Sequence, residues 1–390
     1  MADRGLIQFV RNNKWIYKSF AKGGFHALHA LKLFVRPDDH LILFNSFGGK
    51  KYDDSPRAIY EMMRKDARFK GYKLVWALNN PEQFPEIKRK VKSDSLQYFI
   101  TALKARCWIS NTSIQRGIDF KGKNTYSFNT WHGTPLKKMG AAKQDDYDNT
   151  IIKNNDTVLA QGRFEIDRLC EAWRVTDERF KLFGLPRNDV LANVTPEQKK
   201  KLRKKLGIPE DKTVIFYAPT YRDYNTDAMK SVQLNIPIDY DYWEKILGDK
   251  YIVLFRAHYE VAKYNKLPDT GLWRDVSDYE YLDDLMMVSD VLISDYSSLM
   301  FDYSIMEQPI LGYTYDYQEY SEKRGMYFDI RKEITSFSDS KELVDYLISM
   351  DSQYETEKCK EFKNKYIDEC GSATKKSVDW IYRVLSKEDS

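Results

Sequence analysis

Short apolar runs alternate with helical stretches from residue 38 onward. In the first half of the chain the runs lie at 41–45, 73–78, 107–110, 125–131 and 157–160. This alternation is typical of β-α-β units, which form a parallel sheet covered by helices. We therefore predict an α/β, Rossmann-like doubly wound domain over residues 38–190, with functional residues at the carboxyl ends of its strands.

The same alternation restarts in the second half of the chain. Residues 191–211 are polar and strongly basic, and Thr195-Pro196-Glu197 has the form of a helix start with proline in its first turn. Apolar runs follow at 213–218, 251–256, 291–294 and 309–313, and a lysine-rich helical stretch covers about 340–387. We predict a second Rossmann-like domain over 191–385 and a cleft between the two halves.

The first 37 residues differ from both halves. Seven basic residues and no acidic residue lie between Arg4 and Arg36, interleaved with aromatic residues. A basic, aromatic-bearing amphipathic helix can lie on an anionic membrane surface, so we predict a membrane-associating segment over 1–37. The alternative is a helix packed on the protein with a solvated basic face.

Composition excludes several classes of protein. With 390 residues, 42% hydrophobic, the chain is folded and large enough for two domains. A net charge of +4 is too small for a protein that coats nucleic acid. No apolar run approaches the roughly 18 residues that span a bilayer. The four cysteines form no C-x-x-C pair, so neither a zinc site nor a disulfide framework is predicted.

The string Asn129-Thr130-Trp131-His132-Gly133-Thr134-Pro135-Leu136-Lys137-Lys138 follows a predicted strand. An imidazole at a strand's carboxyl end can accept a proton from a hydroxyl nucleophile, so His132 is the candidate general base. Gly133 would let a substrate approach the backbone closely, Lys137 would supply positive charge, and Thr134 lies in the same turn. The alternative is a buried histidine whose hydrogen bonds are satisfied by the protein.

A second string places serines between a strand and a helix. Ser297 and Ser298 follow the strand at 291–294 and precede an apolar helical face, where free N–H groups and hydroxyls can bind phosphate. Asp302 and Glu307 could accept hydrogen bonds from ribose or polyol hydroxyls. The alternative is an ordinary helix N-cap with solvated acids.

Two further strand ends carry cations. Arg222 follows the run at 213–218, while Arg256 and His258 follow the run at 251–256. Each could be a salt-bridged surface residue, but together at one sheet edge they could neutralise a diphosphate. There is no G-x-G-x-x-G, and the string 117–124 resembles a P-loop but lacks its Ser or Thr and precedes a strand, so we predict no tightly bound cofactor.

Taken together, five strings resemble the CDP-glycerol:poly(glycerophosphate) glycerophosphotransferase family of wall teichoic acid synthesis. The resemblance covers about residues 40–385 and implies a GT-B fold. It implies that His132 is the general base and that Arg222, His258, Ser297, Ser298 and Asp302 lie in the motifs that bind the CDP-polyol, with Arg187 in an interdomain segment. The strings are WHGTPLKKMG, GLPRNDVL, YAPTYRD, FRAHY and SDYSSLMFDYS.

The implied reaction is attack of an acceptor hydroxyl on the polyol-bearing phosphorus of CDP-glycerol, with release of CMP. The implied acceptor is a polyprenyl-diphosphate-linked disaccharide or an already primed teichoic acid precursor, reached from the cytoplasmic face of the cell membrane by a peripheral protein. The intact His-Gly-Thr-Pro core favours extension of a primed chain.

Three alternatives stay open: a CDP-ribitol donor, a GT-B glycosyltransferase that uses a nucleotide sugar, and a basic scaffold without chemistry. Metal dependence and oligomeric state are not predicted.

Overall fold

The fold is taken from a computed structural model that describes residues 24–143, 147, 149–222, 236–257 and 267–386. Most of the predicted membrane-associating segment therefore lies outside the described residues. Its described part contains a helix over 24–32, in which Leu28 is buried against the first domain, and Leu33 and Phe34 just after it, each 84% exposed. No described helix is both long and apolar enough to cross a bilayer.

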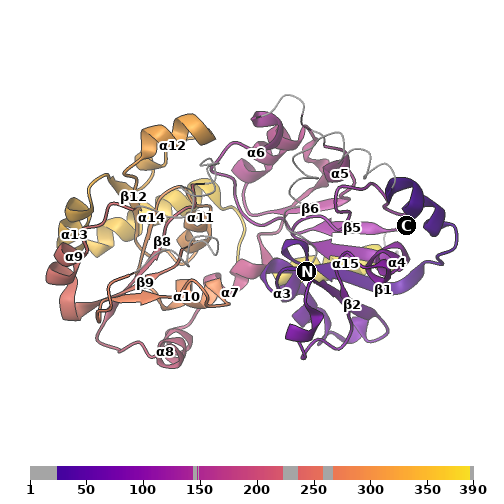
Figure 1. The fold of residues 1–390 in the computed structure, drawn as a ribbon, viewed down its shortest axis with the longest axis horizontal. Helices are drawn as coiled ribbons and strands as arrows, with labels where there is room; N and C mark the ends of the chain where they lie inside the picture. Colours follow the sequence, from indigo (N-terminus) through magenta and orange to yellow (C-terminus); the bar gives the residue numbers. More distant parts are fainter. Residues whose placement is uncertain (1–23, 144–146, 148, 223–235, 258–266, 387–390) are drawn as a thin grey trace.

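The chain forms two lobes, each built on a parallel sheet (Figure 1). In the first lobe the strand order is β3-β2-β1-β4-β5-β6-β7, and every pairing is parallel. The order reverses between β1 and β4, which is the switch point where such sheets bind ligands. The strands are β1 (Asp38–Asn45), β2 (Lys73–Leu78), β3 (Lys90–Lys92), β4 (Ala105–Ser110), β5 (Tyr126–Asn129), β6 (Thr157–Ala160) and β7 (Phe180–Leu182).

In the second lobe the strand order is β10-β9-β8-β11-β12-β13, again with every pairing parallel. Its order reverses between β8 and β11. The strands are β8 (Thr213–Ala218), β9 (Tyr251–Phe255), β10 (Trp273–Asp275), β11 (Val291–Ser294), β12 (Ile310–Tyr313) and β13 (Thr335–Phe337).

Helices cover both faces of each sheet because successive strand residues point to opposite faces. In β1, Ile42 packs toward α3 and α15, whereas Leu43 packs toward α4. In β8, Phe216 packs toward α10, α11 and α14, whereas Ile215 packs toward α9 and α13. The first-lobe helices are α3 (Asp54–Met63), α4 (Leu96–Lys104), α5 (Thr150–Lys153) and α6 (Arg163–Trp173); the following helices are α7 (Asp189–Ala192), α8 (Pro196–Lys205), α9 (Tyr240–Leu247), α10 (Leu282–Val288), α11 (Leu299–Ser304), α12 (Tyr317–Arg324), α13 (Ser340–Ser349), α14 (Ser352–Tyr366) and α15 (Ala373–Ser386).

The helix α15 belongs to the first lobe, where it lies in yellow among the indigo and purple elements (Figure 1). Val378 and Ile381 are buried in the same core as β1 and α3. The second domain predicted over 191–385 is therefore too long, because residues 373–385 pack in the first lobe. The helix periodicity predicts that α15 has an apolar face but does not identify the sheet that this face covers.

The chain therefore crosses between the lobes twice. The first crossing runs through the 3-10 turn Pro186–Asn188 and α7, and the second follows α14. Asp189 joins the crossings, because its carboxylate accepts hydrogen bonds from the backbone N–H groups of Ala373 (2.9 Å) and Thr374 (2.7 Å) at the start of α15. The two crossings thus lie side by side.

Candidate functional site

A cleft of about 890 Å³ lies between the lobes. Its walls include the residues that follow the switch-point strands β1, β8 and β11, as expected for ligand sites of parallel sheets. Seven of the predicted site residues line this cleft: His132, Lys137, Arg187, Arg256, Ser297, Ser298 and Asp302.

His132 lies on a tight turn directly after β5. Trp131 adopts a left-handed backbone conformation (φ 52°), which is uncommon for a large side chain. Its backbone N–H donates to Asn129 Oδ1 at 2.8 Å and its indole N–H donates to the Gly133 carbonyl at 2.8 Å. These bonds hold a strained turn in place, a pattern found at functional sites.

One hydrogen bond sets the tautomer of His132. Its Nδ1 lies 2.8 Å from the carbonyl oxygen of Asn111. A carbonyl only accepts, so Nδ1 carries the proton and Nε2 keeps its lone pair in the neutral ring. Burial lowers the pKa of His132 against the opposing effect of the Asn111 bond. A neutral imidazole with a free Nε2 can accept a proton.

The chain after His132 reaches into the second lobe. Leu136 is buried in the core of that lobe, and its carbonyl accepts from the backbone N–H of Tyr327 at 3.0 Å. Lys137 forms an isolated antiparallel bridge with Met326. Gly133 has φ 139°, a backbone conformation that favours glycine, and a Cβ there would lie only 3.2 Å from Ser298 Oγ, which shows how closely the lobes approach. The candidate base thus lies where the lobes touch.

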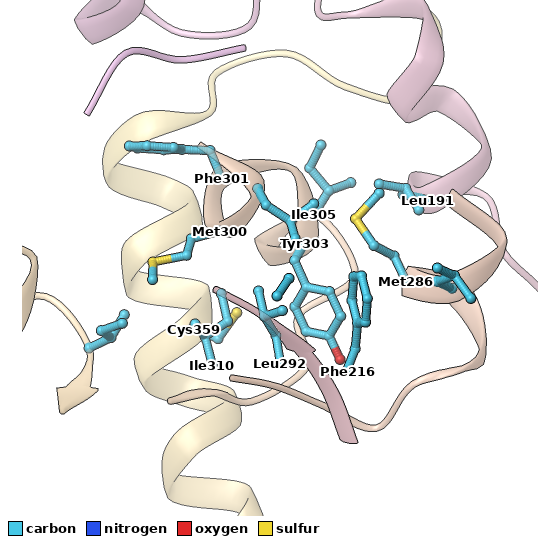
Figure 2. Packing of buried hydrophobic residues seen from close by; sticks show 14 of the residues in the cluster. Leu191, Phe216, Met286, Leu292, Met300, Phe301, Tyr303, Ile305, Ile310 and Cys359 are labelled. Atoms are coloured by element: carbon cyan, nitrogen blue, oxygen red, sulfur yellow. The ribbon is translucent and has the colours of Figure 1, made fainter. Parts of the chain in front are cut away.

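Ser297 and Ser298 stand at the start of α11, a short helix whose residues are all buried. In Figure 2 Met300 and Phe301 lie beside α14, whereas Tyr303 points toward the strands of the sheet. Ser297 Oγ accepts from the backbone N–H of Leu299 at 3.2 Å. Tight packing of α11 therefore fixes the position of both serines at the cleft.

Arg187 joins the two lobes directly. Its guanidinium donates to Asp54 Oδ2 (2.7 Å) at the start of α3, to the carbonyl of His132 (2.9 Å), and to Asp302 Oδ2 (2.7 Å) on α11. Burial alone would lower the pKa of Arg187, but the Asp302 and Asp54 carboxylates raise it above its usual value. Asp302, predicted to meet polyol hydroxyls, instead has its carboxylate occupied by protein donors, with Asn188 on Oδ1 at 2.7 Å.

Behind Asp302 lies a buried polar network from α6 and β6. Gln161 Nε2 donates to Thr134 Oγ1 at 3.0 Å, so Thr134 supports the histidine turn and does not line the cleft. The Gln161 backbone N–H donates to Glu165 Oε2 at 2.8 Å, while Glu165 Oε1 has no partner among the described residues. Burial raises the pKa of Glu165 to about 8.

The predicted cations occupy different surroundings. Arg256 lines the cleft, and one of its nitrogens donates to the carbonyl of Tyr279 at 2.7 Å. Burial lowers the pKa of Arg256, opposed by Asp53. Arg222 is buried and paired with Asp295 (2.8 Å) and Asp316 (2.7 Å), outside the cleft lining.

Two other predicted residues do not reach the cleft in the described part of the chain. Glu307 is paired with Lys363 on α14 at 2.6 Å and does not line the cleft. His258 lies outside the described residues.

Several cleft residues were not singled out from the sequence. Asp53 and Arg57 come from the first lobe, and Asp283 comes from α10 of the second. Burial and the nearby Asp53 raise the pKa of Asp283 to about 6. The string SFGGKKYDDSPRAIYE, which contains Asp53 and Arg57, fits the family resemblance but offers no catalytic spacing of its own. Within the described ranges no group of three or more His, Cys, Asp or Glu side chains is arranged to hold a metal ion.

Two parallel Rossmann-like sheets that meet at a cleft between their carboxyl ends define a GT-B-like protein. The structure is similar to that of the wall teichoic acid polymerase TagF, with a TM-score of 0.81 and 31% sequence identity; the match covers 91% of each chain.

The chain belongs to the CDP-Glycerol:Poly(glycerophosphate) glycerophosphotransferase family, whose model matches residues 27–383. The teichoic acid poly(glycerol phosphate) polymerase of Staphylococcus epidermidis is 36% identical over 313 residues, 75% of this chain but 43% of that protein. The teichoic acid glycerol-phosphate transferase of Staphylococcus aureus is 33% identical over 320 residues, 76% of this chain and 80% of that protein. The chain thus spans less than half of the first relative and most of the second.

Proposed function

We propose that this protein transfers glycerol phosphate from CDP-glycerol to a hydroxyl group of a teichoic acid precursor and releases CMP. The observation that carries the proposal is the contact between the two halves of the candidate site. His132 comes from the first lobe and the α11 serines from the second, and Gly133 brings them together. A proton acceptor thus adjoins a place suited to phosphate.

The donor is inferred from the relatives. Four relatives named as glycerol phosphate polymerases or transferase are 31–36% identical over about three quarters of this chain. Two relatives named as glycerol-phosphate primases are 30–31% identical over 59–68% of it. Those named for ribitol phosphate are 29–30% identical over 54–56% of it. One of the similar TagF structures is described as a soak with CDPG. These similarities favour CDP-glycerol over CDP-ribitol.

In the proposed reaction the acceptor hydroxyl forms a new O–P bond as the bond from phosphorus to the CMP oxygen breaks. His132 Nε2 takes the hydroxyl proton, and the Nδ1 bond to Asn111 stabilises the resulting imidazolium. Negative charge grows on the non-bridging oxygens and on CMP. The hydroxyl groups of Ser297 and Ser298 would donate hydrogen bonds to these oxygens. The positive charges of Arg256 and Lys137 on the cleft walls would offset the growing negative charge.

We propose separate tasks for three of the residues predicted to bind the donor and for Arg187, which was predicted near the acceptor or phosphate. Arg222 holds Asp295 and Asp316, which follow β11 and β12, and so would position the loops behind the cleft without lining it. Asp302 and Arg187 fix the relative position of the lobes. His258 stays a candidate donor contact.

The acceptor is proposed to be a lipid-linked precursor that already carries glycerol phosphate, met at the cytoplasmic face of the membrane. Support comes from the intact His-Gly-Thr-Pro core and from the basic N-terminal segment. In the described part of this segment, Leu33 and Phe34 are exposed and lie next to Lys32 and Arg36 in the sequence.

The test measures CMP release from CDP-glycerol and CDP-ribitol with a bare or singly primed acceptor analogue. We expect release with CDP-glycerol and the primed acceptor. His132→Ala should lower turnover by at least about a hundredfold, the usual contribution of a general base, with donor affinity unchanged. No CMP release with any pairing would favour a nucleotide-sugar glycosyltransferase, and near-normal turnover of the variant would remove His132 from the mechanism.

A further inference from the structure

A second cavity, of about 480 Å³, lies on the first lobe at the far end of α3 from the cleft. We call it the α3 groove. It lies between the end of α3, the turn that follows, and the residues just before β3. Its lining residues include Tyr60, Met63, Arg64, Lys65, Asp66, Phe69, Lys70, Glu86, Lys88 and Arg89.

The groove has an excess of unpaired positive charge. Lys65, Lys70, Lys88 and Arg89 are exposed, and none of the four has an ion pair with a residue that the structure describes. Of the two acids in the lining, Asp66 is already bound by Arg68 at 2.6 Å. Glu86, the other acid, offsets at most one of the four charges, so an anion in the groove would meet cations that no described residue pairs.

The groove continues the cleft along one helix. Arg57 and Glu61 line the cleft, and Arg64, two turns after Arg57 on the same face of α3, lines the groove. The rise of the helix puts about 10 Å between those two arginines. Glu61 lies between them but is bound by Arg64 (3.1 Å) and by the Tyr52 hydroxyl, so its charge is compensated.

We propose that the α3 groove binds the phosphodiesters of an acceptor chain whose terminal hydroxyl lies at His132. The proposal rests on the proposed function and adds a second site to it: the cleft holds the reacting end, and the groove holds phosphates further back along the same polyanion. Buried Tyr60 and Phe69 would contact the carbon backbone between phosphates.

An anionic membrane surface is the competing occupant, and the structure favours the chain. The groove is concave and is connected to the cleft by the face of α3, whereas headgroups present a flat surface. A membrane-binding face combines cations with exposed apolar side chains. Among the described residues, none of the large hydrophobic side chains that are exposed, Leu33 and Phe34 included, lines the groove.

The test compares two double charge reversals of equal net charge. Lys88→Glu/Arg89→Glu changes the groove. Lys201→Glu/Lys204→Glu changes exposed lysines of α8 that line neither cavity and is the matched control. The first assay is binding of a fluorescent poly(glycerol phosphate) oligomer without donor. The second is KM for acceptors carrying one or several glycerol phosphates.

We expect the groove variant to weaken oligomer binding and to raise KM for the longer acceptor by roughly tenfold. KM for the singly primed acceptor and for CDP-glycerol should stay within about twofold of wild type, and the α8 variant should match wild type. Added salt should reduce the difference between the variants.

Unchanged oligomer binding and unchanged KM in the groove variant would overturn the proposal. A third assay measures co-flotation of the protein with anionic vesicles. If the groove variant no longer floats but binds the oligomer as wild type does, the groove binds lipid and the proposal is overturned as well. Failure of the proposed function has another signature, since wild-type protein would then release no CMP with any acceptor.

Discussion

His132 depends for its chemistry on the Nδ1 bond to the Asn111 carbonyl, which leaves Nε2 as the basic atom. The strained Trp131 conformation and the glycine at position 133 are local conditions for that geometry. The sequence predicts the base from its place after a strand. It does not predict that Nδ1 of His132 donates to the carbonyl of Asn111, which lies 21 residues earlier. The two residues follow β5 and β4, and these strands become neighbours only in the sheet.

The pH dependence of the reaction follows from this residue. Burial lowers the pKa of His132, so the ring stays neutral and basic at pH values below the ordinary histidine pKa of about 6.5. The acidic limb of kcat/KM against pH should therefore have its midpoint below that value. A midpoint above it, or an unchanged limb in the residual activity of His132→Ala, would contradict the assignment.

Arg222 shows the limit of inference from single residues. An arginine after a strand is equally suited to a diphosphate and to a carboxylate. Asp295 and Asp316, which bind it, are separated from it by more than 70 positions in the chain. The pairing becomes visible only when β8, β11 and β12 are aligned.

At the scale of elements, Arg187 of the 3-10 turn Pro186–Asn188 connects the start of α3 to α11. This arginine holds Asp54 and Asp302 from opposite lobes in a buried arrangement. Removal of one partner from a buried ion pair leaves charge without compensation.

Arg187→Leu should lower the free energy of unfolding by about 3–5 kcal/mol. The exposed Arg163, paired with Asp167 and Asp177, is the control, and Arg163→Leu should leave the melting temperature near wild type. Urea and thermal unfolding measure both. Equal effects of the two substitutions would show that the Arg187 bridge does not hold the lobes.

Glu165, in the first turn of α6, makes the free energy of unfolding depend on pH. Glu165 keeps its proton up to about pH 8 in the native protein, whereas a carboxyl of ordinary pKa 4.5 is ionised well before that. Unfolding between those pH values releases a proton, so stability falls as pH rises through this window.

Glu165→Gln mimics the protonated acid and removes this dependence. The variant should gain stability relative to wild type between about pH 5 and about pH 8, measured by urea unfolding at each pH. A constant difference across the range would mean that Glu165 is ionised in the native state.

At the scale of the whole molecule, the sequence predicts both sheets because their central strands are strongly apolar. The runs at 73–78, 157–160, 213–218 and 291–294 coincide with β2, β6, β8 and β11. The three-residue strands β3, β7, β10 and β13 were not predicted, since so short a run carries no periodicity. The return of α15 to the first lobe was also missed, for a helix face does not specify its partner.

The packing of α15 is testable through Ile381, which is fully buried against the first sheet. Ile381→Ala should cost about 2–5 kcal/mol of unfolding free energy. Lys375→Ala on the exposed face of the same helix is the control and should have little effect. An equally small effect of Ile381→Ala would mean that α15 is not part of this core.

Because its two crossings lie side by side and are joined by Asp189, the second lobe is topologically an insertion into the first. A lobe attached in this way is held at both ends, so one proteolytic cut inside it does not release it as a fragment. Because its two junctions with the first lobe are close in space, the second lobe meets the condition under which an inserted domain can be replaced by another. A chimaera with altered donor preference should therefore replace residues 191–366 at both junctions, and should keep α15 with the host that supplies His132.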